Sequence, residues 1–232
     1  DRFEALIEKI EAAGLLSYFA DRVAEIELSD QADSLGQMLL ERLPFHQADY
    51  LFSGRSGARI FRSICMLNPK AATDKIEAAF AAFSDEGLSA ARKPRRDLVN
   101  AITALCWPKE TFHKAAQLLL RLAVSENENW ANNATGEFTQ LYHLSLSGTQ
   151  LPALARLQVV DEAIAGGDEE QAKIAIEALG AGLQMGSFSR MSNTTIGGKC
   201  DSERDWHPAT YDDMFDYWKA IFQRLNDLIQ AN

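Results

Sequence analysis

Apolar residues recur at helical spacing through nearly the whole chain, and this pattern restricts the fold more than any other feature of the sequence. The i, i+3/i+4, i+7 spacing runs up to Asn68-Pro69, runs again up to Trp107-Pro108, and continues beyond that proline. Such spacing places the apolar side chains on one face of a helix. No segment shows sustained strand alternation bounded by hairpin turns. The pattern therefore predicts an all-α protein.

Proline residues predict how these helices are organised. A helix, a short break containing proline and a second helix recur around Pro69, Pro108 and Pro152, at separations of 39 and 44 residues. Periods of this length are typical of helix-pair repeats, and proline at a first helical position presets φ without the loss of a hydrogen bond. We expect an irregular α-solenoid of antiparallel helix pairs, HEAT/TPR-like, with a compact helical bundle as the alternative.

The C-terminal part of the chain departs from this regular pattern. We expect one continuous domain, with helical repeats in residues 1–186, a long polar loop in 187–209 and a docking helix in 210–232. Two capping-box signals mark helix starts, Asp168 with Gln171 and Thr210 with Asp213. The last helix carries a broad apolar stripe that we expect to pack on the preceding helices. Four aromatic residues are expected to anchor it: Trp206, Tyr211, Phe215 and Trp218.

The charge of the chain is −10 overall but is unevenly distributed. Residues 52–114 contain 11 Lys/Arg against 6 Asp/Glu, a formal charge of +5, whereas residues 1–51 carry −7 and residues 115–232 carry −8. A basic middle between acidic ends indicates either a contact face for acidic partners or an internal seam of salt bridges. We favour the internal seam.

The number and spacing of the cysteines indicate in which cellular compartment the protein is expected. Cys65, Cys106 and Cys200 are odd in number and far apart, so a disulfide framework is not favoured and a reducing, cytoplasmic setting is expected. No apolar run approaches the ~20 residues that a membrane helix needs, so no membrane association is expected. Because the chain begins at Asp1 rather than methionine, we expect it to be a fragment of a longer protein.

Sequence signatures of catalysis and of cofactor binding do not occur. Gly197-Gly198-Lys199 is followed by Cys200 rather than Ser or Thr, so it does not complete a phosphate-binding loop. Cys200 and His207 share the polar loop, but a metal site needs more than two ligands. We expect no catalytic residue, no cofactor and no metal in this segment.

Candidate partner-binding residues fall in three groups. A basic cluster stands at a helix start, where cations oppose the helix macrodipole, so it is available for a phosphate or an acidic partner; the alternative is a solvated turn that pairs with the acidic helices. Asn132 and Asn133 lie in an amide-rich segment, where they either satisfy carbonyls at a tight turn or contact a ligand. The basic cluster is Arg92, Lys93, Arg95 and Arg96, and the polar loop adds Arg190, Lys199 and Arg204.

One segment reads NENWANNATGEFTQLYHLSLSGTQLPALARLQVV and is followed by FSR, a Gly/Ser-rich loop, DWHPAT and FDYW. This combination resembles the helical region of large bacterial STAND-type NTPases of the antiphage-defence class, over roughly Leu98 to Leu228. In that family an effector and a nucleotide-binding module precede a helical-repeat sensor that recognises a foreign protein. The motifs that carry the resemblance are structural rather than catalytic.

The resemblance implies a protein-recognition module whose partner is a phage protein. ATP binding and oligomerisation would then belong to an NTPase module elsewhere in a parent chain. Three alternatives stay open: a stand-alone helical scaffold, a helical enzyme and a nucleic-acid-binding solenoid. Nucleic-acid binding would require the basic cluster to join Arg55, Arg59 and Arg62 in one continuous track.

Overall fold

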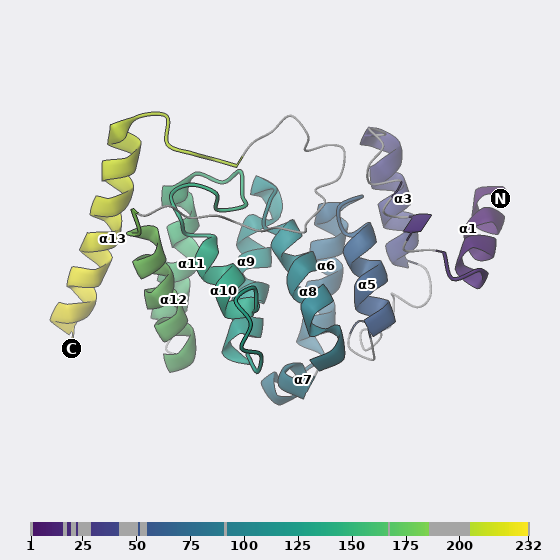
Figure 1. The fold of residues 1–232 in the computed structure, drawn as a ribbon, viewed down its shortest axis with the longest axis horizontal. Helices are drawn as coiled ribbons and strands as arrows, with labels where there is room; N and C mark the ends of the chain where they lie inside the picture. The colour runs from purple at the N-terminus through teal and green to yellow at the C-terminus, as the bar shows by residue number, and fades with distance from the viewer. Residues whose placement is uncertain are drawn as a thin grey trace. The chain divides into compact units, whose positions relative to one another are not determined.

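The computed structural model describes residues 2–15, 18–19, 22, 29–41, 51, 55–90, 92–166, 168–185 and 205–231. All regular secondary structure within these ranges is helical, which confirms the prediction of an all-α protein (Figure 1). The helices are α1 (Arg2–Ala12), α3 (Ser29–Glu41), α5 (Arg55–Ile64), α6 (Pro69–Ala81), α7 (Asp85–Ala90), α8 (Arg92–Leu105), α9 (Lys109–Val124), α10 (Ala134–Gln140), α11 (Ala153–Ala165), α12 (Glu169–Gly182) and α13 (Tyr211–Ala231).

The helices divide into two compact units, with α1 to α8 in the first and α9 to α13 in the second. The boundary lies between Leu105 and Cys106, inside the segment 1–186 that the sequence predicts as one series of repeats. The terminal helix α13 belongs to the same unit as α9 to α12. No helix in the described ranges combines the length and the apolar character that a membrane span requires.

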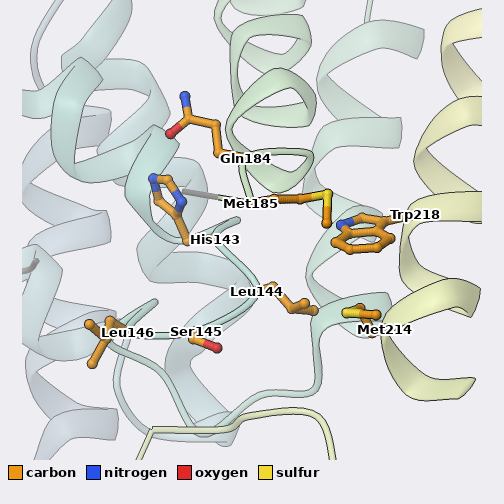
Figure 2. Close-up of a pocket in the computed structure, with 8 residues that line it drawn as sticks. All are labelled: His143, Leu144, Ser145, Leu146, Gln184, Met185, Met214 and Trp218. Carbon is orange, nitrogen blue, oxygen red and sulfur yellow. The ribbon is translucent and has the colours of Figure 1, made fainter. Parts of the chain in front are cut away.

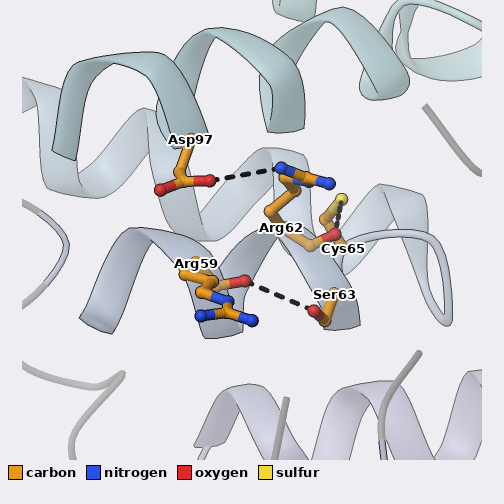
Figure 3. A network of polar contacts seen from close by, with 5 residues as sticks. All are labelled: Arg59, Arg62, Ser63, Cys65 and Asp97. Atoms are coloured by element: carbon orange, nitrogen blue, oxygen red, sulfur yellow. Dashed lines mark hydrogen bonds and ion pairs between the residues drawn. The ribbon is translucent and has the colours of Figure 1, made fainter. Parts of the chain in front are cut away.

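In the first unit, α5 packs against α8, and α6 contacts both α3 and α8. The apolar stripes that the sequence places on α5 and α8 form much of its core, with Phe61, Ile64, Leu98 and Ile102 fully buried. An ion pair between Arg62 Nη1 and Asp97 Oδ1, 3.2 Å long, joins the two helices beside this core (Figure 3). Both partners of this ion pair belong to the basic middle of the chain, residues 52–114.

Helix starts follow the local signals in the sequence. Pro69 is the first residue of α6, and the side chain of Asn68 caps that helix by accepting a 3.0 Å hydrogen bond from the Ala71 N–H. Pro108 and Pro152 instead precede α9 and α11 by one residue, with extended backbones. An extended backbone is usual for the residue at a helix N-cap. Each proline therefore marks a helix start as predicted, two of them one residue early.

The second unit is built from helices that pack in pairs and also contact helices of the adjacent pair. The short α10 packs against α9 and α12, α11 packs against α12, and α13 contacts α11 and α12. The core between them consists of fully buried aromatic and aliphatic side chains, including Phe112, Leu119, Phe138, Leu157 and Leu179. The second unit therefore has a hydrophobic core of its own.

The helix starts predicted from the two capping signals are confirmed in this unit, and the second forms a complete capping box. The Gln171 N–H donates to Asp168 Oδ1 over 2.8 Å at the start of α12. At the start of α13, the Asp213 N–H donates to Thr210 Oγ1 while the Thr210 N–H donates to Asp213 Oδ2. This reciprocal pair satisfies backbone donors that no helical carbonyl can reach.

The face by which α13 packs differs from the predicted one. Its buried side chains are Tyr217 and Ile221, whereas Tyr211 and Phe215 are 79% and 57% exposed, so the prediction of these two as packing anchors is wrong. The apolar stripe is wider than the contact that α11 and α12 offer, and only one edge of it is covered. Trp218 is half-buried and does anchor the helix, because its Nε1–H donates to the Gly182 carbonyl over 3.2 Å.

Candidate functional site

A small pocket opens in the second unit, where the loop after α10 meets the end of α12 and the start of α13. Its volume is about 220 Å³. Figure 2 shows the loop residues on one side of it and the side chains from α13 on the other. The pocket is lined by His143, Leu144, Ser145, Leu146, Gln184, Met185, Met214 and Trp218.

The loop side of the pocket contains a strained residue at an exposed position. Leu146 has φ of +56°, in the left-handed region that leucine rarely adopts, and its side chain is 47% exposed. Two residues later Gly148 has φ of +73°, which costs glycine little because it has no Cβ. Strain of this kind persists only where the surrounding structure fixes the backbone, and such positions cluster at functional sites.

Arg156 of α11 is the main group that fixes this loop, which we call the 141–152 loop. Its side chain is fully buried, and its Nη1 donates to the carbonyls of Leu141 and His143 at 3.1 and 3.0 Å. Its Nε donates to the Leu151 carbonyl at 2.8 Å, so one side chain joins both ends of the loop. Burial lowers the pKa of the Arg156 guanidinium to about 10, which still leaves it charged at neutral pH.

Further contacts hold the middle of the 141–152 loop. Asp205 Oδ2 accepts a 2.8 Å hydrogen bond from the Gly148 N–H, and the Trp206 N–H donates to the Thr149 carbonyl over 2.9 Å. The Trp206 ring lies over the Arg156 guanidinium at 5.3 Å, within the range of a cation–π contact. Trp206 therefore contacts the 141–152 loop and Arg156, whereas the sequence predicted that it would anchor α13.

The opposite side of the pocket is lined by flexible apolar side chains. Met185 follows α12 and is 78% exposed, and Met214 lies in the first turn of α13. In Figure 2 the Met185 side chain extends in the direction of the Trp218 indole. Methionine adapts its shape to what it contacts and is common at surfaces that bind other proteins.

Gly182 allows α13 to approach α12 closely beside the pocket. A Cβ at this position would lie 2.7 Å from Ile221 Cδ1 and 2.8 Å from the Tyr217 hydroxyl oxygen. That hydroxyl donates a 2.6 Å hydrogen bond to the Tyr142 carbonyl, at the beginning of the 141–152 loop. Burial raises the pKa of the Tyr217 phenol, so it remains protonated and able to donate. The position of α13 and that of the loop are thus linked.

The size and lining of the pocket indicate what it can hold. Pockets that enclose drug-sized ligands have volumes of roughly 300–1,000 Å³, larger than this one. A volume of about 220 Å³ suits one or two side chains of a larger partner. Within the described ranges, no three His, Cys, Asp or Glu residues are grouped so that they could hold a metal ion.

The basic cluster predicted from the sequence is not one surface patch. The Arg95 side chain is buried, 1% exposed, and its Nη1 donates to the Leu88 carbonyl over 3.2 Å. Arg95 is thus positioned to hold α7 against α8 and not to contact a partner, which corrects the assignment made from sequence. Arg96 is exposed, and the side chains of Arg92 and Lys93 lie outside the described residues.

Asn133 has a structural role of the kind that the sequence left open. Its Oδ1 accepts a hydrogen bond from the Gly136 N–H at 2.9 Å, which caps α10, and its Nδ2 donates to the Glu128 carbonyl at 2.8 Å. Asn132 is exposed. The candidates Arg190, Lys199 and Arg204 lie outside the described residues.

The residues that line the pocket are not among the sequence candidates. The available signal is the Leu-Ser-Leu-Ser sequence of residues 144–147, whose leucines fall between two helices rather than within one. A second signal is the exposed Met185, which immediately follows a helix end.

A comparison of the chain with protein-family models, with curated proteins and with solved structures finds no match.

Proposed function

We propose that this chain is a protein-recognition module that binds a partner through the pocket beside the 141–152 loop. The observation that carries the proposal is a small pocket whose rim exposes Leu146, on the firmly held backbone of the 141–152 loop, and Met185 beside it. Exposed apolar groups gathered at one site mark places where another protein docks. A rim whose backbone is already fixed loses little conformational entropy on binding.

The more specific proposal combines the pocket with the family resemblance. We propose that the chain is the sensor-side region of a bacterial STAND-type antiphage NTPase, arranged as an irregular α-solenoid, and that its partner is a phage protein. In the second unit the pair α9 and α10 and the pair α11 and α12 each pack together, and helices of one pair contact those of the next, which supports a repeat arrangement. NTP hydrolysis would reside in another module of the parent chain.

The nucleic-acid alternative receives less support. It requires a continuous basic track, but Arg62 is paired with Asp97 and Arg95 is buried. The described arginines that remain exposed in this region are Arg59 and Arg96. The side chains of Arg55, Arg92 and Lys93, which the track would also need, lie outside the described residues.

The test is site-specific photo-crosslinking in phage-infected bacteria. A photoreactive phenylalanine analogue at position 146 is expected to form an adduct with a phage-encoded protein, because that side chain would enter the interface. Leu154 of α11 provides a matched control, since it is an exposed leucine of similar accessibility, 49% against 47%, that does not line the pocket.

The proposal further predicts that Leu146→Asp and Met185→Asp abolish capture of the same protein while Leu154→Asp retains it. A phage protein captured equally well by all three variants would place the binding surface elsewhere. Absence of any adduct at position 146 during infection would contradict the proposed pocket.

A further inference from the structure

The outward side of α13 is an apolar surface that no described element covers. Four large side chains on it are well exposed, and we call this set the outer stripe: Tyr211 at 79%, Phe215 at 57%, Phe222 at 60% and Ile229 at 77%. The residues that pack against α11 and α12 are Tyr217 and Ile221, on the other side of the helix. At about 100° per residue, these two lie more than 100° around the helix from Phe215.

The outer stripe has the period of a coiled-coil seam. Phe215, Phe222 and Ile229 are separated by seven residues each, and Tyr211, Trp218 and Leu225 form a second series with the same period. These are the a and d positions of a heptad repeat. Trp218 and Leu225 are half-buried, and Trp218 contacts the end of α12, so the seam is continuous from the packed face to the outer stripe.

The charges beside the seam indicate what it pairs with. Asp212 and Lys219 occupy successive e positions, on the flank of the seam that faces away from α11 and α12, and both are exposed. In an antiparallel pair of helices, e positions face e positions across the seam. A helix with opposite charges at two successive e positions therefore complements a second copy of itself.

We infer that the outer stripe of α13 pairs with the same stripe of a second copy of this chain, antiparallel and about a two-fold axis. In this register Phe215 of one copy lies opposite Trp218 of the other, and Tyr211 lies opposite Phe222. Asp212 then faces Lys219 of the second copy, and the symmetry forms that pair twice. A parallel arrangement would instead bring e positions against g positions, and the g residues Met214, Ile221 and Leu228 carry no charge.

The size of the surface predicts how tight the dimer is. With about 150–250 Å² for each aromatic side chain, the exposed parts of the outer stripe amount to roughly 500 Å² per copy. Two copies therefore bury on the order of 1,000 Å² from these residues, near the lower limit for a specific interface. A reversible dimer with a dissociation constant in the micromolar range is expected.

Sedimentation velocity of the 232-residue chain tests this inference without any other protein present. From about 1 to about 200 μM, the sedimentation coefficient is expected to rise from that of a monomer to that of a dimer. Phe222→Asp is expected to keep the chain monomeric across this range, whereas Leu154→Asp, which makes the same kind of change on α11, leaves the dimer intact. Circular dichroism of both variants checks that they fold. A wild-type chain that stays monomeric at about 200 μM would overturn the inference.

Charge reversal tests the antiparallel register separately. Lys219→Asp and Asp212→Lys each convert two attractive pairs into two repulsive ones, so each is expected to raise the dissociation constant roughly 5- to 20-fold. The double variant restores opposite charges across the seam and should return the constant to near the wild-type value. Asp227→Lys, an equal change in charge at an exposed f position, is the control and should have little effect. A double variant as weak as either single variant would exclude this register.

Discussion

Arg156 carries a positive charge into the interior of the second unit, and the carbonyls that accept its hydrogen bonds explain why the fold retains it. The guanidinium is planar and presents donors in fixed directions, so one side chain can serve carbonyls at both ends of the 141–152 loop. Lysine, with a single ammonium, could not reach the same set. Arg156 thus holds both ends of the 141–152 loop in place.

Replacement of Arg156 by methionine should therefore be strongly destabilising. Three carbonyls, two of them in buried hydrogen bonds, would lose their donor, and the expected loss in the free energy of unfolding is about 3 kcal/mol or more. Urea unfolding followed by circular dichroism measures it. Arg96→Met, at an exposed position, should change the same quantity by no more than about 0.5 kcal/mol. Equal losses in the two variants would contradict the role given to Arg156.

Substitution of Leu146 is expected to raise stability and to weaken binding of the partner. The left-handed backbone disfavours leucine by roughly 1–2 kcal/mol, whereas asparagine tolerates it. Leu146→Asn is therefore expected to raise the free energy of unfolding by up to about 1 kcal/mol while it weakens capture of the protein partner. Leu154→Asn, in the regular helix α11, should slightly lower stability and leave capture unchanged. A destabilised Leu146→Asn variant would show that the backbone strain is compensated by packing of the leucine.

At the scale of single helices, sequence reasoning succeeds where the determinants are local. The capping residues Asp168 and Thr210 identify the starts of α12 and α13, because a cap acts on backbone groups only two or three residues away. The packed face of α13 is different. Its apolar stripe is broad enough to contact neighbours through more than one edge, and contacts with α11 and α12, distant in sequence, select the edge that contains Tyr217.

Two glycines of α12 give a matched test of how α13 packs. A methyl group at Gly180 would meet no neighbouring atom within 4 Å, so Gly180→Ala should raise the free energy of unfolding by about 0.5–1 kcal/mol through helix propensity. Gly182→Ala would force Ile221 and Tyr217 away and should lower stability by about 1–3 kcal/mol. Thermal unfolding of the two variants compares them. Stabilisation by both alanines would mean that α13 does not pack on Gly182.

For the molecule as a whole, the fold class could be predicted and the candidate site could not. The helical spacing of residues such as Leu98 and Ile102 is visible in any short window of sequence, so the all-α class follows directly. The pocket depends on Leu146, Met185 and Trp218 coming together from segments that are far apart in the chain. No local sequence pattern predicts that these segments come together, and none predicts the division into two units between Leu105 and Cys106.

One buried thiol and two buried phenols determine how the stability of the protein should change at alkaline pH. Burial raises the pKa of the Cys65 thiol from 9.0 to about 12 and raises the pKa of the Tyr142 and Tyr217 phenols above their usual 10.0. Groups whose pKa is higher in the folded chain contribute stability that is present below the unfolded pKa and is lost as pH rises. The free energy of unfolding should therefore be steady near neutral pH and fall steadily above about pH 9.

Urea titrations at several pH values measure this decline. Tyr217→Phe removes one of the three groups, so its stability should fall less steeply with pH above 10.0 than that of the wild type. Tyr211→Phe changes an exposed phenol and should leave the slope as it is. Identical slopes in all three proteins would show that the Tyr217 phenol does not titrate at a higher pH in the folded chain.

The firm anchoring of the 141–152 loop means that the shape of the proposed binding surface is set by other residues than those that give it its chemistry. Arg156, Asp205 and Trp206 act on backbone atoms of the loop, so its path does not depend on the side chains at Ser145 and Leu146. Single substitutions at these two positions can therefore alter which partner fits while the fold stays the same. These two positions are therefore the natural ones to randomise in a binding library.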